Sequence, residues 1–125
     1  MPELPEVETV RRGLEPRLVG RKIVRLELRR KDLRFPFPPK FAARVKGRAI
    51  LGVERRAKYL LISLEGGLVL LSHLGMSGRY GFAGEQQERH DGKHGHALFH
   101  LDDGARLIYS DPRRFGFMDL CEAPA

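Results

Sequence analysis

The first six residues of the chain hold groups that could carry out covalent chemistry. Trimming of Met1, which a cell can perform when a small residue follows, would leave Pro2 with a free secondary amine. An α-amino group titrates at about 7.7–8.0, so part of it is unprotonated and nucleophilic near neutral pH. The carboxylates of Glu3 and Glu6 follow closely. An amine that can form a Schiff base, beside an acid that can move protons, suits covalent catalysis at a sugar or carbonyl carbon. Taken alone, however, this opening favours a structural interpretation, in which Pro5 begins an ordinary helix.

A basic segment, Arg55-Arg56-Ala57-Lys58-Tyr59, stands directly before a hydrophobic run. Lys58 at the entry to a strand could reach a phosphate group while its backbone is held rigidly. The other interpretation is a solvated charge cluster at a strand edge.

Two short segments present unusual side chains next to glycines. Met76 lies between Gly75 and Gly78 in a turn that we expect to be exposed, and a turn fixed by Pro112 presents a second set, Arg113, Arg114 and Phe115. Apolar side chains on stiff loops can enter the base stack of DNA, and arginine can contact phosphate or an unpaired base. Alternatively, Met76 fills a gap in the core and Phe115 packs inward. Two such segments in one basic domain favour a protein that extrudes a base.

The histidines raise the question of a metal site. His94 and His96 could share one face of a strand, with His90 and His100 nearby. No acid or cysteine at suitable spacing completes a zinc ligand set, so we predict no metal in this chain and leave the role of these histidines open. A single cysteine, Cys121, excludes an internal disulfide and fits a reducing cytoplasm.

The charge of the chain points to a polyanionic partner. The net charge is +7, and residues 1–60 hold 17 basic and 7 acidic side chains against 6 and 9 in residues 61–125. Arginine outnumbers lysine, and arginine binds phosphate in a two-pronged manner. A basic surface that serves only solubility is the competing interpretation. No segment has the length of a membrane span or the pattern of a signal peptide, so we expect a cytoplasmic, nucleoid-associated protein. We also expect it to be a monomer.

The hydrophobic pattern predicts a single α+β domain, a two-layer β-sandwich flanked by helices. Its continuous apolar runs suggest strands buried on both faces, with helices packed outside. Glycine-containing turns at 66–67 and 103–104 predict two hairpins. The predicted elements are an N-terminal helix over 5–19, a strand over 24–28, a short helix over 39–46, hairpins of 59–64 with 68–71 and of 97–101 with 106–109, a mobile loop over 81–95 and a strand over 115–120.

Four segments together resemble bacterial formamidopyrimidine-DNA glycosylase, in residue types and in order. They are PELPEVET (2–9), RRAKYLL (55–61), HLGMSGR (73–79) and DPRRFG (111–116). The resemblance runs over nearly the whole chain and is weakest at 81–95. It implies that residues 1–125 form the N-terminal catalytic domain of such an enzyme. The helix-two-turns-helix segment and the four-cysteine finger that holds one zinc in family members are absent from this sequence.

The resemblance also implies catalytic roles for individual residues. The Pro2 amine attacks C1′ of a damaged nucleotide, Glu3 is the proton donor and acceptor at the sugar, and Glu6 is a supporting carboxylate. Lys58 holds a phosphate beside the lesion, and His73 is a second phosphate contact.

The remaining implied roles concern binding of double-stranded damaged DNA. Met76, Arg113 and Phe115 fill the gap left by the extruded base, with Arg113 facing the orphaned partner, and Arg114 is a further DNA contact. The expected activity joins glycosylase and abasic-site lyase steps on oxidised purines such as 8-oxoguanine and formamidopyrimidines.

Two other functions compete with this enzyme hypothesis. The chain could be a non-catalytic module that binds damaged DNA, inactive because the C-terminal half is missing or because Met1 is retained. It could also be an RNA-binding β-domain, which only the charge supports. A free Pro2 amine separates the first two hypotheses, because only the enzyme can form an imine.

Overall fold

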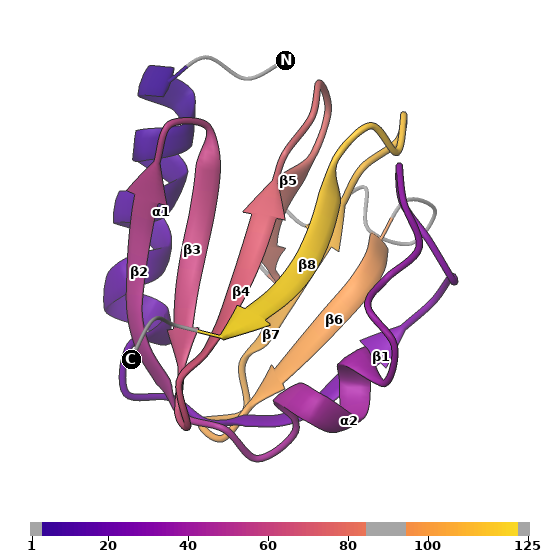
Figure 1. The fold of residues 1–125 in the computed structure, drawn as a ribbon. Coiled ribbons are helices and arrows are strands. Elements are labelled where there is room, and N and C mark those ends of the chain that lie inside the picture. The colour runs from indigo at the N-terminus through magenta and orange to yellow at the C-terminus, as the bar shows by residue number, and fades with distance from the viewer. Residues whose placement is uncertain (1–3, 85–94, 123–125) are drawn as a thin grey trace.

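The computed structural model of the chain describes residues 4–84 and 95–122 (Figure 1). In chain order the elements are α1 (Leu4–Leu18), β1 (Ile23–Leu28), α2 (Phe41–Val45), β2 (Ile50–Arg56), β3 (Tyr59–Leu64), β4 (Leu68–His73), β5 (Arg79–Phe82), β6 (Gly95–Leu101), β7 (Arg106–Ser110) and β8 (Phe117–Glu122).

The strands form two antiparallel sheets, with orders β1-β6-β7-β5 and β2-β3-β4-β8. Their inner faces supply one hydrophobic core, to which every strand and both helices contribute. Tyr109, Leu60, Leu64 and Leu70 are among its largest fully buried side chains. The predicted α+β two-layer sandwich is therefore confirmed.

Helix α1 closes one edge of the sandwich. Its apolar residues recur at helical spacing, and Val7, Leu14 and Leu18 are buried, as the sequence predicts. The helix runs along β2 (Figure 1). The Arg17 guanidinium lies 3.7 Å from the centroid of the Phe82 ring on β5, in the other sheet. The helix thus lies between the two sheet edges rather than outside a sheet face.

Helix α2 closes the opposite side, next to β1 (Figure 1). It is shorter than the predicted 39–46 helix because Lys40, directly before it, has a left-handed backbone (φ 57°) that cannot belong to a helix. Phe41 and Val45 are buried, and the Phe41 ring stacks on Phe37 at 5.6 Å.

Both predicted hairpins are confirmed. Leu64 pairs with Leu68 around the turn of Gly66 and Gly67, which both have positive φ, and β6 pairs with β7 around the turn at 103–104. Positive φ is costly for residues with a side chain, so glycine at both positions favours this turn.

Several predicted boundaries are wrong. The predicted loop over 81–95 begins inside β5 and ends at the first residue of β6, and residues 85–94 lie outside the described part of the chain. The strand predicted over 115–120 begins two residues later, at Phe117. Strand β2 was not predicted, because its sequence mixes charged and apolar residues.

Strand β1 departs from regular alternation, and one burial prediction is wrong in part. An irregularity in the β1–β6 pairing between Ile23 and Arg25 shifts the alternation, so that Val24 is exposed while Ile23 and Leu26 are buried. The prediction of strands buried on both faces holds for β6 and β7, in which residues 97–101 and 107–110 are buried except for the half-buried His100. It is wrong for β3 and most of β4, whose outer-face residues other than His73 are exposed or half-buried. The helices lie at the edges of the sandwich and leave this outer face partly open.

The topology brings distant segments to one end of the molecule. Arg56, Tyr59, His73 and Phe117 are consecutive cross-strand partners at the end of the β2-β3-β4-β8 sheet. In the other sheet, Ser110 pairs with both Arg79 and Gly95 at the corresponding end. The β2–β3 turn, the segment 74–78 and the segment 111–116 therefore lie at the same end as the start of α1 (Figure 1).

Candidate nucleic-acid interface

An open groove of about 650 Å³ lies at this end of the molecule. We call residues 74–78 the Met76 loop and residues 111–116 the Arg113 loop. The groove brings together all five predicted DNA contacts, and its lining is Asp32, Leu33, Arg34, His73, Gly75, Met76, Arg113, Arg114 and Phe115. Sequence reasoning missed the segment 32–34, because it carries no motif of its own and reaches the groove only through the fold.

Two large apolar side chains at the groove are exposed. Met76 is 50% exposed and Phe115 is 43% exposed. The alternatives in which Met76 fills a core gap and Phe115 packs inward are therefore wrong. The Arg113 guanidinium lies 5.2 Å from the Phe115 ring centroid, within cation–π range. The groove thus presents an apolar pair and a cation close together.

His73 has a fixed orientation at the groove. Its ring stacks on Phe117 with 5.2 Å between centroids and 5° between planes, and its Nδ1 accepts a hydrogen bond from the Gly75 amide (3.1 Å). Burial, together with the nearby charges of Arg34 and Lys58, lowers the pKa of His73. The neutral ring therefore carries its proton on Nε2, which is a hydrogen-bond donor suited to a phosphate oxygen.

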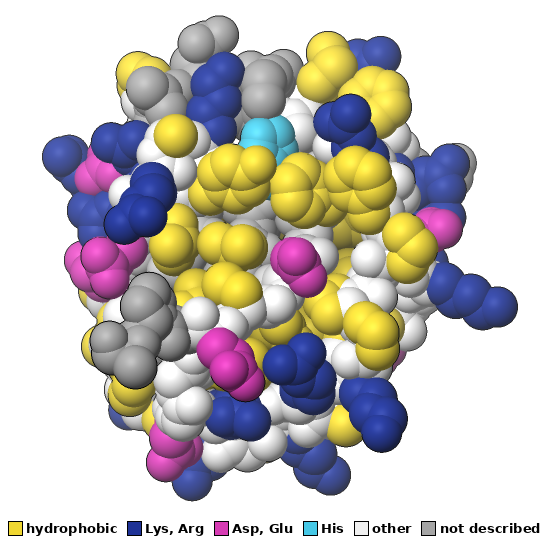
Figure 2. Space-filling view, viewed as in Figure 1, with side chains coloured by type: hydrophobic (Ala, Val, Ile, Leu, Met, Phe, Trp, Pro, Cys, Tyr) yellow, Lys and Arg dark blue, Asp and Glu magenta, His cyan; other side chains and the backbone are white. Residues whose placement is uncertain are grey.

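An aromatic row continues from His73 across the outer face of the β2-β3-β4-β8 sheet. Tyr59 and Phe117 flank the histidine, and Phe35 contacts Phe117 edge-on at 5.4 Å. Figure 2 shows a band of hydrophobic side chains crossing this face beside a histidine, with Lys and Arg side chains around it. Sequence reasoning missed this row, although Tyr59 belongs to a segment that it singled out.

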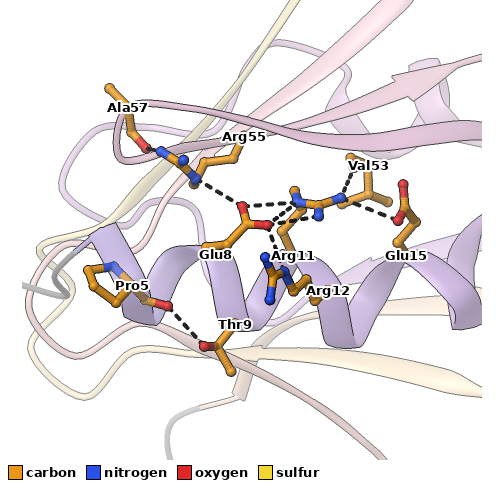
Figure 3. Close-up of polar contacts among 9 residues, drawn as sticks. All are labelled: Pro5, Glu8, Thr9, Arg11, Arg12, Glu15, Val53, Arg55 and Ala57. Atoms are coloured by element: carbon orange, nitrogen blue, oxygen red, sulfur yellow. Dashed lines mark hydrogen bonds and ion pairs between the residues drawn. The ribbon is translucent and has the colours of Figure 1, made fainter.

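Glu8 connects α1 to the β2–β3 turn (Figure 3). Its carboxylate accepts hydrogen bonds from Arg11 (2.8 Å), Arg12 (3.0 Å) and Arg55 (3.0 Å). Arg55 in turn donates to the Ala57 carbonyl at 3.0 Å, next to Lys58. Glu8 therefore helps to fix the turn that presents Lys58, a role that helical periodicity alone does not reveal.

We expect Glu8→Gln to remove a pH-dependent part of the stability. The hydrogen bonds from Arg11, Arg55 and Arg12 lower the pKa of Glu8 from 4.5 to about 2. Because the pKa is lower in the folded state, the carboxylate stabilises the fold above pH 4.5, and this stabilisation is lost as the pH falls towards 2. Thermal unfolding between pH 4.5 and about pH 2 should show a Tm difference between the wild-type protein and Glu8→Gln that shrinks as the pH falls. Glu54→Gln, at an exposed position on β2, is the control, and a Tm difference independent of pH for Glu8→Gln would contradict the prediction.

The structure describes two of the four predicted catalytic residues. Glu6 is exposed in the first turn of α1 and does not line the groove. Lys58 is half-buried in the β2–β3 turn, at the same end of the molecule. Pro2 and Glu3 lie outside the described residues and directly precede α1.

Two of the four histidines whose role was left open are described, and both have structural partners. The buried His96 donates from Nε2 to the Asp111 carbonyl oxygen at 2.8 Å, and His100 lies 3.4 Å from Glu27. His90 and His94 lie outside the described residues. Within residues 4–84 and 95–122, no three His, Cys, Asp or Glu side chains are grouped to hold a metal ion. No helix in the same ranges has the length and apolar character to cross a membrane.

Comparison with known proteins assigns this chain to a family. Residues 1–118 match the model of the formamidopyrimidine-DNA glycosylase N-terminal domain. The formamidopyrimidine-DNA glycosylase of Sinorhizobium fredii is 61% identical over 96% of this chain, and that of Allorhizobium ampelinum is 56% identical over 98%. The chain covers 45% and 46% of these two relatives, so it spans about half their length.

Solved structures agree with this assignment. A crystal structure of Lactococcus lactis Fpg with DNA containing an abasic site superposes with a TM-score of 0.84 and 38% identity, over 97% of this chain and 44% of that one. The same enzyme bound to DNA containing Fapy-dG gives a TM-score of 0.83. The fold is thus that of the N-terminal domain of a formamidopyrimidine-DNA glycosylase. The chain belongs to the formamidopyrimidine-DNA glycosylase family.

Proposed function

We propose that the chain carries the catalytic half of a base-excision repair enzyme, which removes oxidised purines from duplex DNA and nicks the strand at the abasic site. The observation that carries this proposal is the exposure of Met76 and Phe115 beside Arg113 at one groove. Extrusion of a nucleotide costs a few kcal/mol, and side chains that occupy the vacated space offset part of that cost. The similarity to Fpg structures bound to abasic-site and Fapy-dG DNA supports the same function.

The proposed chemistry begins at the N-terminus. The Pro2 nitrogen bonds to C1′ as the bond from C1′ to the base breaks, and the N–H proton that Pro2 then releases goes to the departing base. Glu3 then protonates the sugar ring oxygen, so that the ring opens and an iminium forms between Pro2 and C1′. Loss of a C2′ proton expels the 3′ phosphate and nicks the strand. Glu6, at the start of α1, stabilises the cationic intermediate.

Phosphate binding has two proposed contributors next to the groove. The Nε2–H of His73 donates to one phosphate oxygen, and the Lys58 ammonium binds a neighbouring phosphate. The Glu8–Arg55–Ala57 contacts support this role, because they hold the turn that presents Lys58. Phosphate contacts do not depend on the base sequence of the DNA. They therefore hold the duplex in place while the groove detects the missing base.

A duplex with a single 8-oxoguanine opposite cytosine tests the enzyme function. The trimmed protein is expected to release the oxidised base and nick the labelled strand at its position, as resolved on a denaturing gel. Binding that favours an abasic-site duplex without any nicking would support the non-catalytic damaged-DNA module instead. The absence of both nicking and binding preference would overturn the proposed function.

We expect Met76→Ala to reduce recognition of a missing base. Burying a methionine side chain contributes about 1.5–3 kcal/mol, which corresponds to roughly a tenfold or greater loss of affinity. The Kd for a duplex with a tetrahydrofuran abasic analogue should rise by that factor, and the Kd for the intact duplex should stay nearly constant. Leu51→Ala, at a 60% exposed residue on β2 that does not line the groove, is the matched control. Equal losses for both duplexes would show that Met76 does not enter a gap.

A further inference from the structure

Asp111 is a buried acidic residue to which the proposed chemistry gives no role. It is 0% exposed and lies directly after β7. Its Oδ1 accepts hydrogen bonds from Ser77 Oγ (2.7 Å) and the Arg114 amide (2.9 Å). Its Oδ2 accepts from the Tyr109 hydroxyl (2.9 Å) and the Gly116 amide (2.9 Å). Four donors satisfy a buried carboxylate, whose desolvation would otherwise be costly.

These donors come from both loops of the groove. Ser77 follows Met76 in the Met76 loop, while Arg114 and Gly116 flank Phe115 in the Arg113 loop. Ser77 Oγ also accepts a hydrogen bond from the Arg113 amide at 3.1 Å. Each of the three gap-filling residues is therefore held next to Asp111. Met76 is followed by Ser77, which binds Asp111; the Arg113 amide binds Ser77; and Phe115 lies between two residues whose amides bind Asp111.

The fourth donor is fixed by the core. Burial, together with the Asp111 carboxylate, raises the pKa of Tyr109 far above its usual value, so its hydroxyl stays protonated and donates. His96 adds a contact from β6, because its Nε2 donates to the Asp111 carbonyl oxygen. Asp111 is thus held against the β6–β7 hairpin as well as between the loops.

The two loops also touch directly. A Cβ on Gly75 would overlap the Gly116 amide and lie 2.5 Å from the Phe115 carbonyl carbon. This contact requires glycine in the Met76 loop. In the Arg113 loop, Arg114 has a φ of 56°, a left-handed conformation that L-residues avoid unless their surroundings hold them. Its amide donates to both the carboxylate and the carbonyl oxygen of Asp111, which stabilises that conformation.

We propose that Asp111 is a positioning residue that joins the Met76 loop to the Arg113 loop, so that Met76, Arg113 and Phe115 enter the base stack as one rigid unit. Asp111 itself touches no DNA and acts through Ser77 and through the Arg114 and Gly116 amides. The inference rests on the proposed function, since it concerns the way in which the groove recognises the space of an extruded nucleotide. A preorganised unit loses less conformational entropy on insertion than three independent side chains.

Ser77→Ala tests this proposal without removing the buried carboxylate. The first measurement is NMR hydrogen exchange of the Arg114 and Gly116 amides in the DNA-free protein. Loss of one hydrogen bond to a charged group corresponds to about a tenfold effect, so we expect exchange in the Arg113 loop to accelerate about tenfold. The second measurement is the ratio of Kd values for intact duplex and for duplex with a tetrahydrofuran site. We expect this ratio to fall about tenfold with little change for intact duplex.

Two further variants make the test specific. Ser77→Thr keeps the hydroxyl and should retain both the slow exchange and the Kd ratio. Ser63→Ala, on β3 and outside the groove, should change neither the amide exchange nor the Kd ratio. A general loss of stability would instead raise the Kd for both duplexes equally. Unchanged amide exchange in Ser77→Ala, or equal losses for both duplexes, would overturn the proposal. Accelerated exchange in that variant, with neither nicking nor a preference for the abasic duplex in the wild-type protein, would support the coupling and overturn the proposed function.

Discussion

A chain in which the Pro2 nitrogen is blocked, by retention of Met1 or by an added N-terminal residue, is expected to form no borohydride-stable adduct with abasic-site DNA. The reason is chemical, because an amide nitrogen delocalises its lone pair into the carbonyl group and cannot attack C1′. The trimmed chain, with its free secondary amine, should form the adduct. The measurement is reductive trapping followed by gel electrophoresis, with intact-mass analysis of the N-terminus of each preparation.

A control for this experiment must separate binding from chemistry. The blocked chain should bind a tetrahydrofuran duplex with a Kd within about twofold of the trimmed chain, because the groove lies on other segments. An adduct formed equally well by the blocked chain would assign the nucleophile to another amine, such as Lys58. That result would contradict the proposed role of Pro2.

Gly116→Ala is expected to destabilise the protein by about 3 kcal/mol, which corresponds to a decrease in Tm of about 10 °C. The added Cβ would overlap the Tyr109 hydroxyl oxygen and would lie 2.5 Å from the His73 carbonyl oxygen and 2.9 Å from Asp111 Oδ2. These neighbours belong to the core, to backbone and to a buried carboxylate, so none can move without losing hydrogen bonds or packing. Urea and thermal unfolding measure the effect directly.

Gly13→Ala is the matched comparison for this substitution. Gly13 lies within α1 and is exposed, and a Cβ added to it would meet no atom within 4 Å outside its own helix backbone. Alanine should therefore stabilise the helix by about 0.5–1 kcal/mol, through its higher helix propensity and the smaller entropy of the unfolded chain. A similar loss of stability in both variants would show that the crowding around Asp111 is not the cause.

Some structural features follow from local sequence alone. The spacing of Val7, Leu14 and Leu18 predicts a helix with one buried face, because that face must pack against the core. The glycine turns at 66–67 and 103–104 predict both hairpins, since their backbone conformations are set within a few residues. The four family motifs also predict which side chains meet at the groove, and His73, Met76, Arg113, Arg114 and Phe115 all line it.

Other features depend on contacts between distant segments. Glu8 is far from Arg55 in the chain, and the sequence gives no reason to pair these two residues among the many charges near them. Asp111 is equally distant from Ser77, and as part of a Pro-Arg-Arg turn it is easily interpreted as a surface residue. The irregularity in β1 and the late start of β8 depend on pairing with other strands, which propensity does not encode.

The sequence by itself determined the family, the helix and hairpins, and the residue types available for covalent chemistry and DNA binding, because these depend on local order and spacing. Only the tertiary structure decided that Met76 and Phe115 are exposed, that the segment 32–34 completes the groove, and that Asp111 is buried between the two loops. The physical reason is that burial and hydrogen-bond pairing are set by the packing of the two sheets. That packing brings together residues that the chain keeps far apart.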